Sequence, residues 1–298
     1  LRIFIFLAEV GTIFLLSKLL YLINISRKAI LIYALNPLVI IELVGNVHIE
    51  GIMIFFMVAA VYQLQKGKWV YSAILMSLAI CTKLIPLILL PLLIPTIGTK
   101  KSIKYFLVIL VSCLVLFYPF MSQATLLHIG SSIGLYFQTF EFNASVYYLL
   151  REVGFWITSY NQIGIIGPFL SLLSLGLILW ISFKDFGGNY KVIFVKGLLV
   201  LTIYFALATV VHPWYLSTLI LLAVFVKGNR YVLVWSAVVY LSYYTYRDSN
   251  YQEVVWLTLL SYAPIYFLFF KDVINDRKLK ARSNKQSLRM KQNQNLVG

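Results

Sequence analysis

A succession of long apolar runs constrains the fold of this chain more than any other feature of its sequence. The runs cover approximately residues 3–23, 29–45, 50–65, 69–97, 105–121, 163–183, 192–211, 213–226, 231–246 and 254–270. A helix that crosses a bilayer needs about 20 apolar residues. Hydrophobic residues make up 61% of the 298 residues and charged residues 12%, and a soluble domain of this size has too little interior to bury so much apolar surface. The pattern predicts an all-α, polytopic transmembrane bundle and excludes a soluble enzyme, a secreted disulfide scaffold and a disordered chain.

The excess of basic residues, a net charge of +15, predicts how the bundle is oriented. Lys and Arg accumulate in the cytoplasmic loops of membrane proteins. Here they cluster between the apolar runs at Arg27/Lys28, Lys66/Lys68, Lys100/Lys101/Lys104, Lys184/Lys191, Lys227/Arg230 and from Lys271 onward. If all of these clusters are cytoplasmic, each pair must be separated by an even number of crossings. The stretch between each pair of neighbouring clusters contains two apolar runs, except the stretch from Lys66/Lys68 to Lys100, which contains the single run 69–97.

If the run 69–97 forms two helices instead of one, the number of crossings between its flanking basic clusters becomes even, as the condition requires. As a single helix it would be about 44 Å long, against a hydrocarbon core of about 30 Å. Lys83 stands in its middle, and Pro86 follows. Two short helices that meet near Lys83 give about 11 crossings, some of them short or broken, with residue 1 outside. The predicted organisation is a transmembrane domain over 1–270 and a basic, disordered cytoplasmic tail over 271–298, drawn to anionic lipid rather than to nucleic acid.

Most of the polar residues then fall on the outer face, where four groups are candidates for binding. In the first, Asn46, His48 and Glu50 alternate, so an extended turn would project all three to one side. An imidazole beside a carboxylate handles protons or binds a sugar hydroxyl or phosphate. The alternative is a polar loop between two helices. A metal site is disfavoured because no further ligand has recognisable spacing, and we expect neither a metal nor another cofactor.

The second group is Lys83 at the broken helix, either a counter-charge for a phosphate or a lysine that extends to the membrane surface. The third is His212 with Trp214 and Tyr215, where the rings stack on a sugar or a prenyl chain and the imidazole binds a polar head. The alternative for this third group is an aromatic belt at the membrane interface.

The fourth group lies in the long, less apolar segment 122–160. Asn143, Tyr147 and Arg151 fall on one helical stripe, and the helix is predicted to lie along the membrane surface. Arg151 would face a phosphate or, equally well, pair with Glu152. The two cysteines, Cys81 and Cys113, are interpreted as reduced thiols in helices.

Several short blocks, in this order, resemble the GT-C glycosyltransferases, and most closely the bacterial polyprenyl-phosphate-mannose-dependent mannosyltransferases. The blocks are Asn36-Pro37-Leu38 with Glu42 and Gly45-Asn46-Val47-His48-Ile49-Glu50, Lys66-Gly67-Lys68-Trp69, Lys83-Leu84-Ile85-Pro86-Leu87, Phe142-Asn143-Ala144-Ser145-Val146-Tyr147-Tyr148 and His212-Pro213-Trp214-Tyr215. The resemblance implies an inner-membrane enzyme that moves a hexose, with mannose expected, from a polyprenyl-phosphate donor to a glycan or lipid acceptor. Transfer would occur on the outer face, with inversion.

The resemblance also implies an acidic general base in the first outer loop, after a first helix. No segment here matches that loop, so we expect the base upstream of Leu1 and a truncated N-terminus, and we interpret Glu50 as a group that binds donor or acceptor. Two alternatives stay open. A transporter or flippase of a lipid-linked sugar would normally show two matching halves, whereas one clear break is found here, at 81–86. A scaffold subunit without chemistry is the other.

Overall fold

The described part of the computed structural model is an all-α bundle, and it comprises residues 1–125, 128–129, 131–132, 139–187, 191–247, 249 and 252–273. In chain order the elements are α1 (Arg2–Leu22), η1 (Arg27–Ile30), α2 (Leu31–Ala34), η2 (Val39–Gly45), α3 (Glu50–Gln65), α4 (Trp69–Thr82), η3 (Ile85–Leu92), α5 (Leu93–Ile97), α6 (Thr99–Phe117), η4 (Tyr118–Phe120), α8 (Val146–Thr158), α9 (Ile163–Phe183), α10 (Val192–Leu207), η5 (Pro213–Leu216), α11 (Ser217–Ala223), α12 (Arg230–Val238) and η6 (Val239–Arg247). Residues 255–273 are helical as well. The predicted fold class is therefore confirmed.

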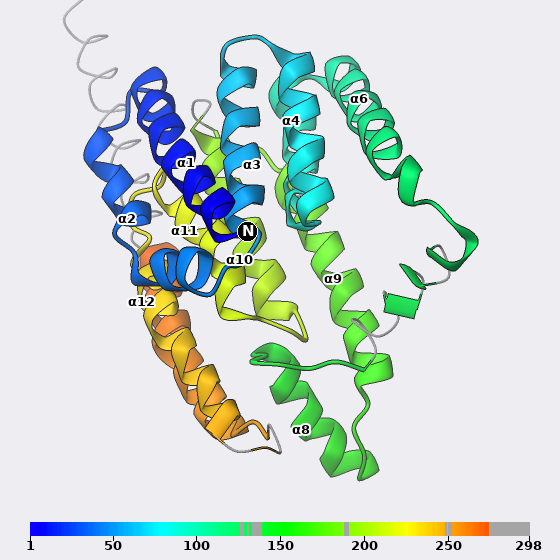
Figure 1. The fold of residues 1–298 in the computed structure, drawn as a ribbon. Helices are drawn as coiled ribbons and strands as arrows, with labels where there is room; N and C mark the ends of the chain where they lie inside the picture. Colours follow the sequence, from blue (N-terminus) through cyan, green and yellow to red (C-terminus); the bar gives the residue numbers. More distant parts are fainter. Residues whose placement is uncertain are drawn as a thin grey trace, which may run out of the picture.

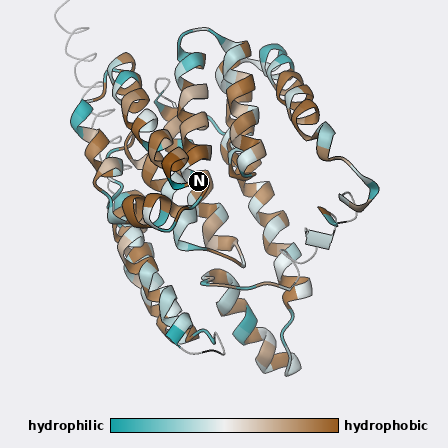
Figure 2. Cartoon of the chain, viewed as in Figure 1, coloured by the Kyte–Doolittle hydropathy of each residue, from teal (hydrophilic) through white to brown (hydrophobic). Residues whose placement is uncertain are grey.

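Among the described residues, three helices are long and apolar enough to cross a membrane, namely Arg2–Leu22, Thr99–Phe120 and Ile163–Phe183. A fourth span results if the pair Arg27–Ala34 and Val39–Gly45, bent by 61°, is counted as one. Several other apolar helices are shorter, so the number of about 11 crossings stays a prediction. Figure 2 shows hydrophobic residues along α6 and α9, while the α3–α4 connection is hydrophilic.

The outward faces of α6 and α9 are apolar, as expected for helices in contact with lipid. Leu107, Leu110 and Leu114 on α6 are exposed, as are Leu172 and Leu175 on α9. Water would make such surfaces costly, whereas lipid chains solvate them. The outer surface and the buried core thus have the same polarity, which distinguishes this chain from a soluble bundle.

The predicted break at Lys83 is confirmed. Helix α4 ends at Thr82, Lys83 adopts an extended conformation (φ −161°, ψ 144°), and η3 begins at Ile85 with Pro86 in its first turn. Proline has no N–H to continue the helical ladder, and it disfavours the α conformation in the residue before it. The chain therefore changes direction at Lys83. One turn earlier in the chain, between Gln65 and Trp69, α3 reverses into α4, and the two helices run antiparallel in Figure 1.

A second break in the helices lies at Pro37, between α2 and η2. Between α2 and η2, the Asn36 side chain accepts a hydrogen bond from the Leu38 N–H at 2.9 Å and donates one to Ser236 Oγ at 3.1 Å. These two bonds hold the bend against α12. Because of the bend of 61°, η2 does not continue the direction of α2 but turns sideways and leads to the beginning of α3 (Figure 1).

The core forms around α3, which contacts both α1 and α4, while α4 in turn contacts α6. Ser72 and Tyr105 share a buried hydrogen bond of 2.9 Å between α4 and α6. The α3–α4 turn includes Gly67 at φ 76°, a conformation that favours glycine. Helix α8 lies at the opposite end of the molecule from this turn (Figure 1).

The predicted tail begins inside a helix. Residues 271–273 continue the helix past the predicted boundary at 270, and Asp272 accepts a hydrogen bond of 2.7 Å from Arg230. Residues 274–298 lie outside the described residues, so the disorder predicted for them stays a prediction.

Candidate functional site

Six of the predicted site residues meet where α3 begins and α4 ends, at the end of the bundle away from the α3–α4 turn. They are His48, Glu50, Lys83, His212, Trp214 and Tyr215. We refer to these six residues as the His–Lys cluster. Asn46 lies at its edge, while Asn143, Tyr147 and Arg151 belong to a second group around α8.

Trp214 is held between two imidazole rings. Its ring stacks on His48 at a centroid distance of 3.8 Å and on His212 at 4.5 Å. The stack arises because Pro213 starts the short helix η5 directly after His212. Both faces of the indole are therefore covered. Trp214 positions the two imidazoles, and the predicted stacking of a sugar on its face would require one of them to move.

Lys83 forms an ion pair with Glu50 at the centre of the cluster, and its ammonium group lies 4.1 Å from the ring centroid of Tyr215. Glu50 is buried, whereas a quarter of the Lys83 side chain remains exposed. Burial lowers the pKa of Lys83, and the neighbouring Glu50 carboxylate opposes that shift. The extended backbone at the helix break directs this cation toward the imidazoles rather than toward a free surface.

The extended turn predicted for Asn46, His48 and Glu50 does not form. Val47 takes a positive φ of 63°, and Glu50 is already the first residue of α3. Asn46 and His48 consequently approach Glu42 in the preceding helix η2, while Glu50 pairs with Lys83. Alternation fails as a guide here because a helix start and a left-handed residue interrupt the extended backbone.

Glu42 is a functional candidate that sequence reasoning did not select as a site residue. Its carboxylate is completely buried. Oε2 accepts hydrogen bonds from Asn46 Nδ2 at 3.1 Å and from the Tyr243 hydroxyl at 2.9 Å, and His48 Nε2 lies 3.5 Å away. An acidic residue inside an apolar run is costly in a membrane and is usually functional, so this position carried a signal.

Glu42 also retains bonding capacity. Its Oε1 atom and the Tyr240 hydroxyl are both buried and form no hydrogen bond of ordinary length and angle, although the Tyr240 hydroxyl lies close enough to interact with the Glu42 carboxylate. Buried polar atoms are nearly always satisfied in folded proteins. A ligand hydroxyl that donates to Glu42 and accepts from Tyr240 would satisfy both.

A second buried acid, Glu9, lies behind the first turn of α3. It accepts a hydrogen bond of 3.1 Å from the Tyr33 hydroxyl. A side chain at position 51 would collide with it, because a Cβ atom on Gly51 would lie 2.8 Å from Glu9 Oε1. Glu9 has its own partner and contributes to packing between α1, α2 and α3.

Arg151 and Tyr147, on α8, converge on Glu141. Arg151 pairs with Glu141 and, at 3.0 Å, with Glu152, so the predicted alternative of pairing with Glu152 is present. The Tyr147 hydroxyl donates to Glu141 Oε2 at 2.5 Å. Arg151 thus pairs with two carboxylates, whereas Lys83 pairs with one, Glu50, and is therefore the better counter-charge for a phosphate.

Asn143 fastens the segment before α8 to the segment before His212. Its side chain donates to the Val211 carbonyl at 3.0 Å, and its N–H donates to Glu253 Oε1 at 2.7 Å. Phe142 forms an isolated parallel bridge with Val210, and its ring lies 4.8 Å from that of His212. Asn143 therefore links the α8 group to the His–Lys cluster.

The charge state of His212 follows from its surroundings. Burial, together with the nearby charges of Lys83 and His48, lowers its pKa to about 4. The imidazole is neutral at pH 7 and has one donor and one acceptor nitrogen. Its Nδ1 atom is buried without a hydrogen-bond partner. For His48, burial lowers the pKa, while Glu50 and Glu42 oppose the shift.

An apolar groove lies beside the same region. It has a volume of about 760 Å³ and is lined by Asn36, Pro37, Ile41 and Tyr240, among other residues. Tyr240 stands 5.8 Å, between ring centroids, from Tyr243, the residue that donates to Glu42. Within the residues that the structure describes, no group of three or more His, Cys, Asp and Glu side chains is arranged to hold a metal ion.

Comparison with known families gives one match, which covers the N-terminal third of the chain. Residues 1–98 match the family described as alpha-(1->6)-mannopyranosyltransferase, N-terminal domain. The match fits the resemblance to GT-C-like mannosyltransferases and supports glycosyl transfer, specifically of mannose, as the general reaction. The matched range includes Glu42, His48 and Lys83. No curated protein and no solved structure matches the chain.

Proposed function

We propose that this chain transfers a hexose, mannose in the first instance, from a polyprenyl-phosphate donor to a glycan or glycolipid acceptor at the His–Lys cluster. The observation that carries the proposal is the convergence of one lysine and two stacked histidines beside a buried carboxylate with a free oxygen. All of these groups lie at one end of an apolar bundle. A lipid-linked substrate is soluble in the same membrane.

The leaving group accounts for the cationic half of the cluster. As the glycosidic bond breaks, negative charge develops on the prenyl phosphate, and fixed cations and donors stabilise it in a site from which water is excluded. Lys83 supplies the charge, and His48 and His212 supply donors. Glu50 holds Lys83 in place before the donor arrives.

The acceptor hydroxyl accounts for Glu42. In an inverting transfer the hydroxyl attacks the anomeric carbon as its proton passes to a base. Glu42 Oε1 has bonding capacity for that hydroxyl, so we assign Glu42 to acceptor recognition. This assignment gives Glu42 a binding role and leaves the role of general base to another carboxylate.

The groove beside Asn36 and Pro37 suits the hydrophobic part of the donor. It is mainly apolar, and it reaches Tyr240 at the edge of the site. A prenyl chain in this groove would bring its phosphate to the cluster without leaving the bilayer. We place this end of the bundle on the outer face of a bacterial inner membrane, and we take the α-(1→6) linkage named for the matched family as the first linkage to test.

Radiolabelled polyprenyl-phosphate mannose, added to membranes that contain the chain, tests the proposal. The acceptor is a short mannoside with a free 6-hydroxyl, and guanosine diphosphate mannose serves as the competing donor. We expect transfer from the lipid-linked donor only. The combined variant Lys83→Ala, His48→Ala and His212→Ala should lose transfer by about 100-fold or more, because removal of a single fixed donor already costs about that much in known enzymes.

Two matched substitutions serve as controls. Lys104→Ala removes an exposed lysine at the other end of the bundle, and His128→Ala removes a histidine outside the cluster, so both should transfer normally. Unchanged transfer by the combined variant would reject the site. Movement of the labelled lipid across the membrane without transfer would show a transporter instead.

A further inference from the structure

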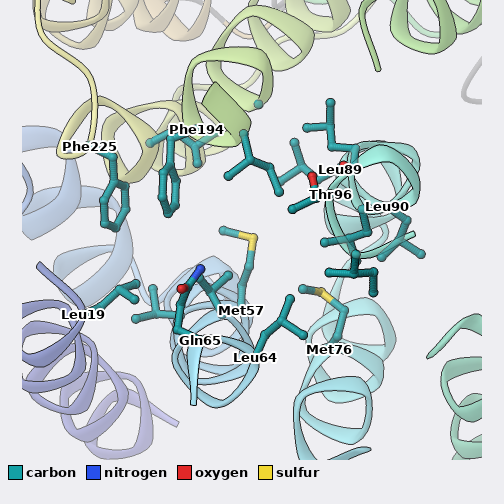
Figure 3. Close-up of a pocket in the computed structure, with 18 of the residues that line it drawn as sticks. Leu19, Met57, Leu64, Gln65, Met76, Leu89, Leu90, Thr96, Phe194 and Phe225 are labelled. Atoms are coloured by element: carbon teal, nitrogen blue, oxygen red, sulfur yellow. Dashed lines mark hydrogen bonds between the residues drawn. The ribbon is translucent and has the colours of Figure 1, made fainter. Parts of the chain in front are cut away.

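A second cavity lies at the opposite end of the bundle from the His–Lys cluster. It has a volume of about 310 Å³ and is enclosed by α3, α4, the η3–α5 segment, α10 and α11. Figure 3 shows Met57 pointing into it, with Phe194 and Phe225 on one side and Leu90 on the other. The size is at the lower end of the range for ligand pockets, roughly 300–1,000 Å³.

The cavity is separate from the proposed active site. Its lining on α3 runs from Met57 to Gln65, whereas Glu50 begins the same helix and belongs to the cluster. At 1.5 Å per residue, the lining on α3 begins about 10 Å along the axis from Glu50 and ends about 22 Å from it. A ligand in this cavity would therefore not occupy the site proposed for glycosyl transfer.

The polarity of the lining is distributed unevenly. Most of the wall is leucine, isoleucine, valine, methionine and phenylalanine, while Gln65 and Lys101, both exposed, stand at one end. Apolar cavities do not hold water, and leaving one empty forfeits the contacts of every side chain around it. The wall therefore selects a hydrocarbon chain, and the exposed end selects a polar head group.

The charge around the exposed end specifies that head group. Lys101 lines the cavity and its neighbour Lys100 is exposed at the start of α6, whereas Lys104, further along the helix, does not line the cavity. Polybasic segments attract anionic lipids at the membrane surface. We propose that this cavity binds one acyl chain of an anionic phospholipid, with the phosphate of its head group at Lys101.

Gly197, on α10, lines the cavity, so a larger side chain at this position would reduce its volume. A Cβ atom there would lie 3.4 Å from Leu222, 3.6 Å from Leu89 and 3.7 Å from Leu92, all of which line the cavity. A leucine at position 197 would therefore extend into the space of the acyl chain. Gly176 on α9 is a matched control, because a Cβ atom there meets nothing within 4 Å.

Native mass spectrometry of the purified chain in detergent tests the proposal, with dioleoylphosphatidylglycerol and dioleoylphosphatidylcholine titrated in parallel. We expect one phosphatidylglycerol to bind at least tenfold more tightly than phosphatidylcholine. Lys101→Glu should reduce the affinity for phosphatidylglycerol to that for phosphatidylcholine, while Lys104→Glu, with the same change in charge on the same helix, should not. Gly197→Leu should abolish this binding, and Gly176→Leu should preserve it.

Equal binding of the two lipids, or equal effects of the two lysine substitutions, would overturn the assignment of an anionic head group. A polyprenyl phosphate that binds more tightly than phosphatidylglycerol and is lost in Gly197→Leu would show that the cavity takes a prenyl chain instead. If Gly197→Leu is too unstable to be purified, the comparison of Lys101→Glu with Lys104→Glu still tests whether the head group binds at Lys101.

Discussion

At the scale of single residues, Glu42 combines complete burial with an unsatisfied oxygen, and both depend on its position in η2. We expect Glu42→Gln to lower kcat/KM for the acceptor by about 100-fold, because a neutral amide oxygen accepts a weaker hydrogen bond from the acceptor hydroxyl than a carboxylate does. Transfer assays over a range of acceptor concentrations measure the effect. Glu9→Gln is the matched control, since Glu9 is also buried but already has Tyr33 as its partner. Equal losses in both variants would contradict a special role for Glu42.

His212 makes the stability of the chain depend on pH. Its folded-state pKa of about 4 lies below the ordinary value of 6.5, so between these values the unfolded chain binds the proton more readily. The stabilisation is complete above pH 6.5 and is lost as the pH falls toward 4. The melting temperature should fall by roughly 3 °C as the pH is lowered from 6.5 to 4. His212→Asn should remove this part of the pH dependence, and an unchanged profile would contradict the prediction.

The residues of the His–Lys cluster were predictable from the sequence because charge parity places their segments on one face. The partners of Arg151 and Glu42 were less accessible. Glu141 lies ten positions before Arg151, across the start of α8, and Tyr243 reaches Glu42 from a distant helix. Contacts of this kind depend on how helices pack, which neither hydropathy nor charge encodes.

At the scale of elements, the break at Lys83 follows from Pro86 and from the maximum length of a membrane-spanning helix, and it is confirmed. The bend of 61° near Pro37 also contains a proline. The π-helical character of η2 and the 3₁₀ character of η3 and η6 were not predictable. These segments have only 7 to 9 residues, about two turns, so their hydropathy pattern is too short to distinguish 3.0 residues per turn from 3.6 or more and does not report which carbonyl each N–H bonds.

Glu253 joins three segments and should contribute strongly to stability. It accepts hydrogen bonds from the Asn143 N–H and from the Tyr148 hydroxyl. Glu253→Ala would leave two donors without an acceptor, and we expect the free energy of unfolding to fall by about 2–3 kcal/mol. Chemical unfolding in detergent measures the change. Glu152→Ala, which removes a half-exposed partner of Arg151, should cost less than about 1 kcal/mol. A reversed order would show that Asn143 and Tyr148 do not depend on Glu253.

At the scale of the whole molecule, composition was sufficient to predict a helical membrane bundle, and the run boundaries agree closely with the observed helices. The number of crossings does not follow from the helices alone. Three helices have the length of a full span, while the remaining crossings that parity requires would use shorter ones. The distribution of basic residues predicts on which side of the membrane each loop lies. That prediction can be tested without knowing the number of crossings.

The loops themselves provide that test. In a Cys81→Ser, Cys113→Ser background, Ser159→Cys places a thiol in the exposed α8–α9 connection, and Lys68→Cys places one in the exposed α3–α4 turn. We expect a membrane-impermeant maleimide to label position 159 in intact cells and position 68 only after permeabilisation, because the basic turn should be cytoplasmic.

The opposite labelling pattern would have a chemical consequence for the proposed function. The His–Lys cluster lies at the end of the bundle away from Lys68, so it would then face the cytoplasm, where nucleotide sugars are available. A donor dissolved in the membrane would no longer be needed to explain the groove beside Pro37. Orientation and donor class therefore stand together, and labelling at positions 68 and 159 tests both before any substrate has been identified.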